Sequence, residues 1–364
     1  MDALTQTLLA HGHDVTIVTP RMPRRSAAPT SIVAIPSLPL PTRTAYRLTV
    51  PYLPRIAPAL SIVHAHSPFV TGALAVSYAR RRSVPLVFTY HTQLEAYAHY
   101  IPFETNLTRA AATLLTRTYA NAADAVVVPT RAMEEHLRAI GVQRPIAVVP
   151  SGIDVAAFAR GRRSEALRAR LGIGPRERMI LGVGRLGREK NVELALEAFS
   201  RVTAPGARLV VVGDGTHRAA LERTARQLGI AGRTTFAREF ARETLPDAYA
   251  SADVFLFTSR SETQGLVLIE ALAAGASIVA LDMPQTREVL AGAGTLADDN
   301  AAALAAALDR SLGSRGGADG AARTRAWAYD AAHCARGILD LYASLIGKPS
   351  PHAKRARAGR PQPV

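Results

Sequence analysis

The sequence predicts an α/β protein in which two doubly wound domains each form around a parallel sheet. Short, unbroken runs of Val, Ile and Leu recur along the chain, as they do in strands that are buried on both faces. Helix-length segments separate these runs, which is the pattern of βαβ units. The runs fall into two series with a Pro/Gly turn at residues 149–158 between them, so we expect two domains.

The first series begins with a helix rather than a strand. Asp2–Ala10 has a helical pattern that Gly12 closes as a C-cap, and Asp14–Thr19 follows as a strand that ends at Pro20. Further strands of this series are expected at Ile32–Pro36, Ser61–His66, Pro85–His91, Ala125–Thr130 and Ile146–Gly152.

The second series predicts the second sheet. Its strands are expected at Met179–Arg185, Arg208–Gly215, Thr234–Phe240, Asp253–Ser259 and Ala276–Asp282. An amphipathic helix is expected at 326–346, and the basic, Pro- and Gly-rich stretch 347–364 has the composition of a disordered tail. We therefore expect a first domain at 1–149 and a second at 150–325.

The composition narrows the class of protein. With 364 residues, 48% of them hydrophobic, and a mean hydropathy of +0.07, the chain has enough apolar material for sizeable cores. No apolar run reaches the roughly 18 residues that a membrane-spanning helix needs. The single cysteine, Cys334, excludes an internal disulfide framework and a thiolate zinc site, and it fits a reducing cytosol.

The charge balance favours anionic partners. Lys and Arg number 44 against 29 Asp and Glu, a net charge of +15. Nucleic acid, anionic lipid or a phosphorylated substrate would suit this charge, and composition drift in an Arg- and Ala-rich proteome is the alternative explanation. Nucleic acid is disfavoured because the sequence has no RNP-like aromatic strand, zinc-finger spacing or recognition-helix signature.

Polar residues follow the strand at Met179–Arg185. Glycines, among them Gly184, permit a tight turn, while Arg185 and Lys190 place two cations at the mouth of a helix N-terminus. This arrangement suits a diphosphate, and a solvated surface loop is the alternative. The glycine spacing lacks the GxGxxG fingerprint, which disfavours a dehydrogenase.

Two carboxylates follow the strand at Asp253–Ser259. Glu262 is expected at or before a helix N-terminus, with Glu270 about two turns in on the same face. With the helix-start amides of Thr263–Val267 they could hold a ligand that carries hydroxyls and a phosphate. The alternative is a helix-start carboxylate and a second one buried by chance, although an unpaired buried carboxylate is costly.

Histidines end two strands of the first series. His64, His66 and His91 are candidates for chemistry, with packing or capping roles as the alternative. No metal is expected there, because the histidines lie on different strand ends without a carboxylate at ligand spacing.

These motifs together resemble those of the family-4 retaining glycosyltransferases. SETQGLVLIEALAAG is similar to the family's E-x7-E signature, and GVGRLGREKNVELALEAF to its donor-phosphate loop. HAHSPFVTG and VFTYHTQLEAYAHYIP resemble the acceptor-domain segments of members that glycosylate diacylglycerol or phosphatidylinositol lipids. The resemblance covers residues 1–346 and implies a GT-B fold: two Rossmann-like domains, a cleft between them, and a final helix that crosses back to the first.

The resemblance also implies roles for the candidate residues. Arg185 and Lys190 take the place of a metal ion on the donor diphosphate, Glu270 holds the ribose, and His91 touches the donor sugar or the leaving phosphate. Glu262 contacts the sugar hydroxyls. The implied catalytic residues are His91 and Glu262, and the implied donor-binding residues are Gly184, Arg185, Lys190, Gly265, Leu266 and Glu270.

The implied reaction transfers a hexose from a UDP- or GDP-hexose, with retention and without metal or cofactor. A membrane lipid acceptor places the enzyme on the cytosolic side, peripheral on an anionic membrane surface. The basic, aromatic stretch Leu38–Leu60 is the candidate membrane element, with an ordinary loop as the alternative. The rival functions are extension of a soluble or polyprenyl-linked saccharide, and an inactive nucleotide-sugar-binding protein.

The sequence departs from the family pattern at three places. The family usually opens with a strand and a Gly-rich loop that meets the donor. Both are missing here, so we expect either that the natural start lies upstream of Met1 or that this is a truncated copy. Ser151 stands where the family often has Asn. Arg238 stands where many members have Gly near the nucleotide base, which leaves the base preference open.

Overall fold

The computed structural model describes residues 2–21, 31–39, 47–50, 60–96, 105–314 and 320–347. The chain divides into two compact units. Unit 1 comprises Met1–Pro150 and Cys334–Val364, and unit 2 comprises Ser151–His333. The division after residue 150 lies in the Pro/Gly turn between the two series of apolar runs.

Unit 2 contains one parallel sheet of six strands in the order β11-β10-β9-β12-β13-β14. In chain order this is the 3-2-1-4-5-6 arrangement of a doubly wound fold, which reverses direction between β9 and β12. The five expected strands are present, and the short β14 was not predicted. Their bounds are β9 (Arg178–Val183), β10 (Ala207–Val212), β11 (Thr234–Ala237), β12 (Val254–Phe257), β13 (Ile278–Leu281) and β14 (Thr295–Ala297).

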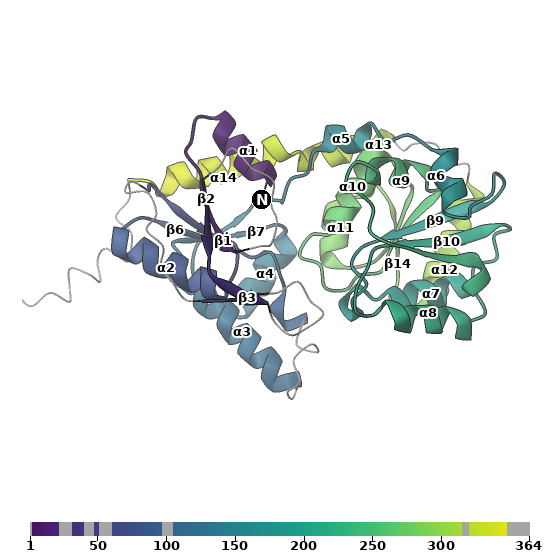
Figure 1. Ribbon diagram of the computed structural model, residues 1–364, viewed down its shortest axis with the longest axis horizontal. Coiled ribbons are helices and arrows are strands. Elements are labelled where there is room, and N and C mark those ends of the chain that lie inside the picture. The colour runs from purple at the N-terminus through teal and green to yellow at the C-terminus, as the bar shows by residue number, and fades with distance from the viewer. Residues whose placement is uncertain are drawn as a thin grey trace, which may run out of the picture. The chain divides into compact units, whose positions relative to one another are not determined.

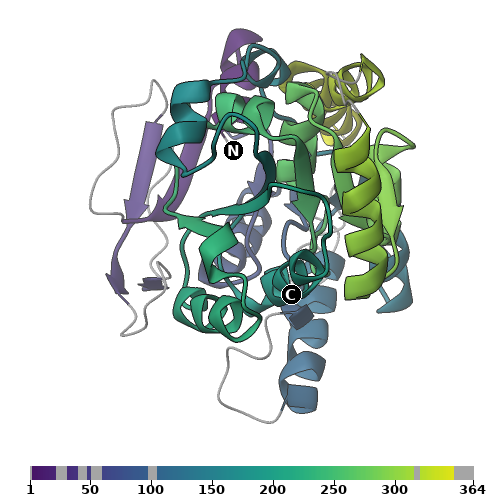
Figure 2. The same ribbon diagram turned by 90° about the vertical axis from the view of Figure 1, so that its right-hand side faces the viewer.

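Helices cover both faces of this sheet, as Figures 1 and 2 show. One face packs against α5 (Val155–Ala159), α6 (Glu165–Arg170), α9 (Leu245–Ser251), α10 (Leu266–Ala274), α11 (Pro284–Leu290) and α13 (Gly320–Ala326). The other packs against α7 (Val192–Ser200), α8 (Arg218–Gln227) and α12 (Ala301–Gly313). Burial of apolar side chains on both faces explains the unbroken apolar runs.

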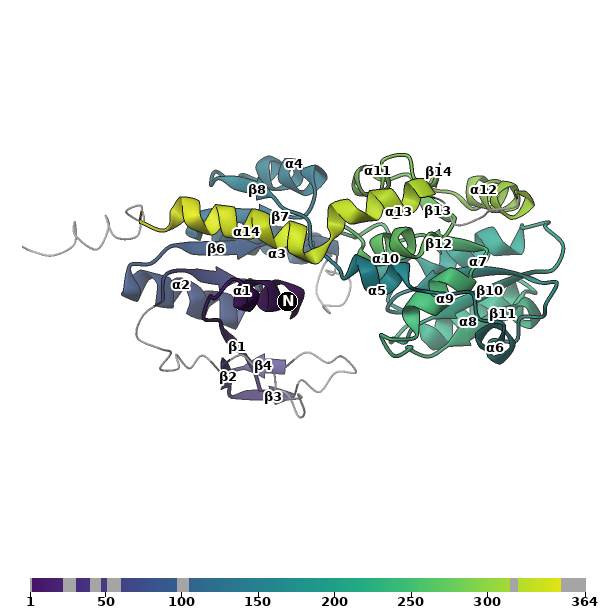
Figure 3. The same cartoon turned by 90° about the horizontal axis from the view of Figure 1, so that it is seen from above.

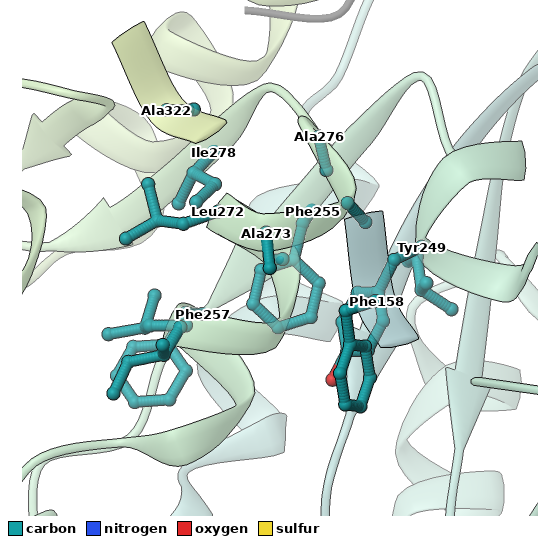
Figure 4. Packing of buried hydrophobic residues seen from close by; sticks show 14 of the residues in the cluster. Phe158, Tyr249, Phe255, Phe257, Leu272, Ala273, Ala276, Ile278 and Ala322 are labelled. Atoms are coloured by element: carbon teal, nitrogen blue, oxygen red, sulfur yellow. The ribbon is translucent and has the colours of Figure 1, made fainter. Parts of the chain in front are cut away.

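An aromatic cluster fills the core on the α10 side (Figure 4). The ring of Tyr249 packs edge-on against Phe158 and Phe255, with centroid distances of 6.0 and 5.3 Å. These contacts hold α5 and α9 on the sheet, and they bring the Tyr249 hydroxyl to the candidate site described below.

Unit 1 contains a four-stranded parallel sheet and two smaller strand pairs. The parallel sheet has the order β5-β6-β7-β8. Among the described strands, β1 pairs only with β2 and β5 pairs only with β6, so the strands expected in one sheet form two parallel groups. The strands are β1 (Thr16–Pro20), β2 (Ser31–Ile35), β3 (Ser37–Pro39), β4 (Arg47–Thr49), β5 (Val63–Ala65), β6 (Leu86–Thr89), β7 (Ala125–Val128) and β8 (Ile146–Val148).

The helices of unit 1 include one from the far end of the chain. The apolar face of α14 (Ala331–Leu345) packs with α1 (Asp2–Ala10) against Val87 and Val127 of the central strands, as Figure 3 shows. The other helices are α2 (Val70–Arg82), α3 (Thr105–Ala122) and α4 (Arg131–Ala139).

The helix expected at 326–346 is interrupted. A 3-10 turn, η4 (Trp327–Tyr329), follows α13, and Asp330 is extended before α14 begins at Ala331. The cause is a backbone pairing: Ile153 N donates to Tyr329 O at 3.0 Å, and Ala331 N donates to Ile153 O at 2.9 Å. This pairing joins the chain segments just inside both ends of unit 2.

Two further expectations fall partly or wholly outside the described residues. Of the candidate membrane element 38–60, the structure describes 38–39, 47–50 and 60, which include parts of an antiparallel β3–β4 pair. The stretch 348–364 is not among the described residues. Within the described part of the chain, no helix combines the length and apolarity needed to cross a bilayer.

Candidate active site

The loops that follow β9 and β12 meet at the point where the strand order of unit 2 reverses. In open parallel sheets, ligands bind at this position beyond the carboxyl ends of the strands. The β9 loop is held by the β10 loop: Leu186 N donates to Asp214 O at 2.9 Å, and His217 N donates to Leu186 O at 3.0 Å. A Cβ at Gly213 would lie 2.0 Å from Gly184 O, so this approach requires glycine.

Both predicted cations of the β9 loop contact carboxylates. Arg185 Nη2 donates to Glu189 Oε1 at 2.8 Å, and the Glu189 side chain is only 1% exposed. Lys190 forms an ion pair with Glu262 of the β12 loop, and both side chains keep about a fifth of their surface exposed. The structure thus brings Lys190 and Glu262 together across 72 residues of sequence.

The β12 loop is anchored by hydrogen bonds along its length. Ser261 Oγ donates to Glu189 O at 3.2 Å, and Gln285 Nε2 donates to Glu262 O at 2.9 Å. Gln264 bonds both backbone groups of Ser151. Residues on both sides of Glu262 are therefore fixed.

Helix α10 begins later than the sequence suggested. It starts at Leu266 after Gly265, which has a φ of +80°. Glu262 lies in the loop before the helix N-terminus, as expected, but Glu270 lies one turn into the helix rather than two, so the expectation that the two carboxylates share a helix face was wrong. Leu268 N donates to Gly265 O at 2.9 Å. The first N–H groups of an α-helix have no acceptors within the helix, so the start of α10 at Gly265 and Leu266 is a position that suits an anion.

The side chain of Glu270 contacts Tyr249 of α9. Tyr249 Oη donates a 2.7 Å hydrogen bond to Glu270 Oε2, and Tyr249 is fully buried. Burial and the nearby carboxylate raise the pKa of Tyr249 well above its usual value, so the phenol stays protonated. Burial also raises the pKa of Glu270, and the hydrogen bond from Tyr249 opposes that rise.

The three candidate histidines lie together in unit 1. His64 and His66 are stacked with ring centroids 4.1 Å apart, and His66 and His91 with centroids 5.1 Å apart. His91 follows the carboxyl end of β6 and keeps an exposed edge. Desolvation lowers the pKa of all three rings, that of His64 to about 3, so they are neutral near pH 7.

Sequence reasoning missed Tyr249, Glu189, Gln264 and Gln285. Arg185 and Glu189 are four residues apart, but they lie in a loop and a 3-10 turn rather than on one α-helix, so this spacing did not mark their ion pair. The other three bond to groups that are distant in the sequence, and no local pattern marks them. No group of three or more His, Cys, Asp or Glu side chains in the described part of the chain is arranged to hold a metal ion.

Family models match both units. The model described as Glycosyltransferase Family 4 matches residues 1–157, and the model described as Glycosyl transferases group 1 matches residues 163–326. In fold, the chain is similar to sucrose-phosphate synthase from Thermosynechococcus elongatus, with a TM-score of 0.78, 22% identity, and coverage of 94% of this chain and 91% of that one. The fold is that of the GT-B glycosyltransferases.

Relatives identified by sequence show the family to which the chain belongs. It is 33% identical over 294 residues to a GDP-mannose-dependent alpha-mannosyltransferase of Mycobacterium tuberculosis, covering 77% of this chain and 73% of that protein. It is 33% identical over 237 residues to the alpha-monoglucosyldiacylglycerol synthase of Streptococcus pneumoniae, covering 64% of this chain and 54% of that protein. The chain belongs to the family-4 glycosyltransferases.

Proposed function

We propose that this chain transfers a hexose from a UDP- or GDP-hexose to a membrane lipid such as diacylglycerol or phosphatidylinositol. The observation that carries the proposal is the meeting of Lys190, Glu262 and the N-terminus of α10 at the reversal point of the unit 2 sheet. A cation, a carboxylate and helix-start amides there suit a diphosphate next to a hydroxyl-bearing sugar.

Different residues of the site bind different parts of the nucleotide-sugar donor. Arg185, Lys190 and the amides of Gly265 and Leu266 bind the diphosphate, which dispenses with a metal ion. Glu262 accepts hydrogen bonds from the sugar hydroxyls, and Glu270 accepts them from the ribose. When the phosphate enters, Lys190 exchanges its contact with Glu262 for one with the diphosphate, and Glu262 becomes available to the sugar.

We expect the reaction to be a retaining, front-face transfer, as the resemblance to the retaining family-4 enzymes implies. The bond between the anomeric carbon and the donor phosphate oxygen breaks, and an acceptor hydroxyl bonds to the same face of that carbon. The acceptor proton passes to the departing phosphate. Because His91 is neutral near pH 7, it contributes a hydrogen bond to the donor rather than a positive charge.

The lipid acceptor is supported by the names of the glucosyldiacylglycerol-forming relatives and by an exposed surface of α3. Leu107 and Leu114 are 68% and 54% exposed and lie seven residues apart, on one side of the helix. The helix also carries Arg109 and Arg117 and has no acidic residue. Two exposed leucines on a helix whose only charged side chains are basic suit an anionic bilayer surface, although Arg109 lies on the opposite side of the helix from Leu107.

A transfer assay tests the proposal. The full chain is incubated with UDP- or GDP-hexoses and vesicles that contain diacylglycerol or phosphatidylinositol, and the lipids are analysed by mass spectrometry and NMR. We expect an α-linked hexosyl lipid with one donor, and more of it on anionic vesicles. Product only with a soluble or polyprenyl-linked saccharide favours the extension reaction, and nucleotide binding without any product favours the inactive binding protein.

A further inference from the structure

Three stacked imidazoles connect the predicted donor-contacting histidine to the interior of unit 1. His66 Nδ1 and His91 Nε2 are 2.8 Å apart, which is a hydrogen bond between two rings inclined by only 18°. His64 stacks on the other side of His66. His91 is therefore one end of an ordered row of rings.

The other end of the row is fixed by hydrogen bonds to both nitrogens of His64. Its Nδ1 lies 2.5 Å from Tyr342 Oη, and its Nε2 lies 2.5 Å from Thr89 Oγ1. Tyr342 is 9% exposed and belongs to α14, which packs on β6 and β7. The helix that returns from the end of the chain thus contacts the row directly.

The neutral state of these rings gives the His66–His91 contact a direction. A neutral imidazole has one N–H and one bare nitrogen, so one ring must donate and the other accept. Whichever way the bond runs, it fixes which nitrogen of His91 carries the proton. It also fixes the plane of the ring.

We propose that His66 is a positioning residue that sets the tautomer and orientation of His91, and that His64 and Tyr342 hold His66 in place. The consequence for turnover rests on the proposed function, in which His91 touches the donor. The effect on the tautomer does not depend on it, because it concerns only the ring contacts of unit 1.

The test combines a spectroscopic and a kinetic measurement on the full chain. Histidine side chains are labelled with ¹⁵N, and long-range ¹H–¹⁵N correlations at pH 7 report the tautomer of His91, assigned with His91→Gln. We expect one neutral tautomer in the unsubstituted protein and a mixture in His66→Phe, which keeps an aromatic ring but has no nitrogen. Turnover should fall roughly 10–100-fold, as expected for a misplaced group, with little change in the KM for the donor.

Three further variants distinguish a positioning role of His66 from a general disturbance of unit 1. His66→Asn keeps a polar group near the position of Nδ1 and should restore much of the turnover and the single tautomer. Tyr342→Phe should shift His91 in the same direction as His66→Phe, but less. Ser344→Ala removes a hydroxyl that bonds Leu341 O on an exposed part of the same helix as Tyr342, and should change neither measurement.

An unchanged His91 tautomer and unchanged turnover in His66→Phe would overturn the proposal. If His66→Phe does not fold, the same readouts in Tyr342→Phe decide. A His91 tautomer and a turnover in Tyr342→Phe identical to those of the unsubstituted protein would then overturn the proposal. If the unsubstituted protein itself transfers no hexose, the proposed function fails. The tautomer measurement on His91 still tests the positioning role of His66 in that case.

Discussion

Tyr249, which lies in the α10 side of the unit 2 core, donates a 2.7 Å hydrogen bond to the carboxylate of the partly buried Glu270. Burial disfavours the ionised carboxylate, while the phenol stabilises it. Tyr249 therefore keeps Glu270 a hydrogen-bond acceptor, which is the state that a ribose hydroxyl requires.

Tyr249→Phe should weaken nucleotide binding and shift its dependence on pH. Without the phenol, the pKa of Glu270 rises further, so binding is lost at a higher pH as the solution is acidified. Titration calorimetry of UDP and GDP between pH 5 and 8 measures this, with a loss of about 1 kcal/mol expected at pH 7. Nucleotides that lack the ribose hydroxyl bonded by Glu270 should bind equally to both proteins; an equal loss for UDP and its deoxy analogues would assign Tyr249 a packing role alone.

Glu262→Gln should lower turnover strongly and nucleotide affinity only modestly. The amide keeps the shape of the side chain but removes the charge that meets Lys190 and, in the proposed reaction, the sugar hydroxyls. Steady-state kinetics and nucleotide titrations on the same preparation separate the two effects. Full activity in both Glu262→Gln and Glu270→Ala would show that the site has been placed wrongly.

Activity should survive excess EDTA. Side-chain cations and helix-start amides neutralise the diphosphate in the proposed site, so no metal ion is needed there. The transfer assay with and without EDTA checks this. Loss of activity on chelation, restored by Mg²⁺ or Mn²⁺, would reject this account of the phosphate.

Asp253→Asn should destabilise unit 2. Arg168 is fully buried, and its guanidinium donates to Asp253 Oδ2 at 3.2 Å and to Ser251 O at 2.8 Å. Removing the carboxylate charge leaves the buried cation with only the exposed Glu165, 3.7 Å away, as a counterion, at a cost of up to roughly 3–5 kcal/mol. Chemical unfolding measures the loss, and Asp299→Asn, which breaks an exposed pair with Arg260, is the control that should change little.

Most of the strands could be predicted because burial on both faces leaves a local signature. Every apolar run named as a strand in unit 2 became one, from Met179–Arg185 to Ala276–Asp282. The three-residue β14 and the β3–β4 pair were missed because they are too short to show a period. The break at Asp330 was missed because its cause is a backbone pairing with Ile153, which no local pattern reveals.

Individual residues of the candidate site could be predicted from the sequence, but the contacts between them could not. Position after a strand identified Arg185, Lys190 and Glu262. The ion pair between Lys190 and Glu262 depends on β9 and β12 being neighbours, which follows from the strand order and not from spacing along the chain. The Tyr249–Glu270 bond likewise depends on how α9 and α10 pack.

The central claim is that the β9 and β12 loops of unit 2 bind the diphosphate of a nucleotide sugar. Titration of the full chain with UDP, GDP and the corresponding nucleosides tests it most directly, using Arg185→Gln and Lys190→Gln with the exposed Arg201→Gln as a control of matched charge. Each site variant should lose about 1.5–3 kcal/mol of diphosphate affinity, while nucleoside affinity and the control stay unchanged. Equal losses for nucleotide and nucleoside, or no loss at all, would contradict the claim.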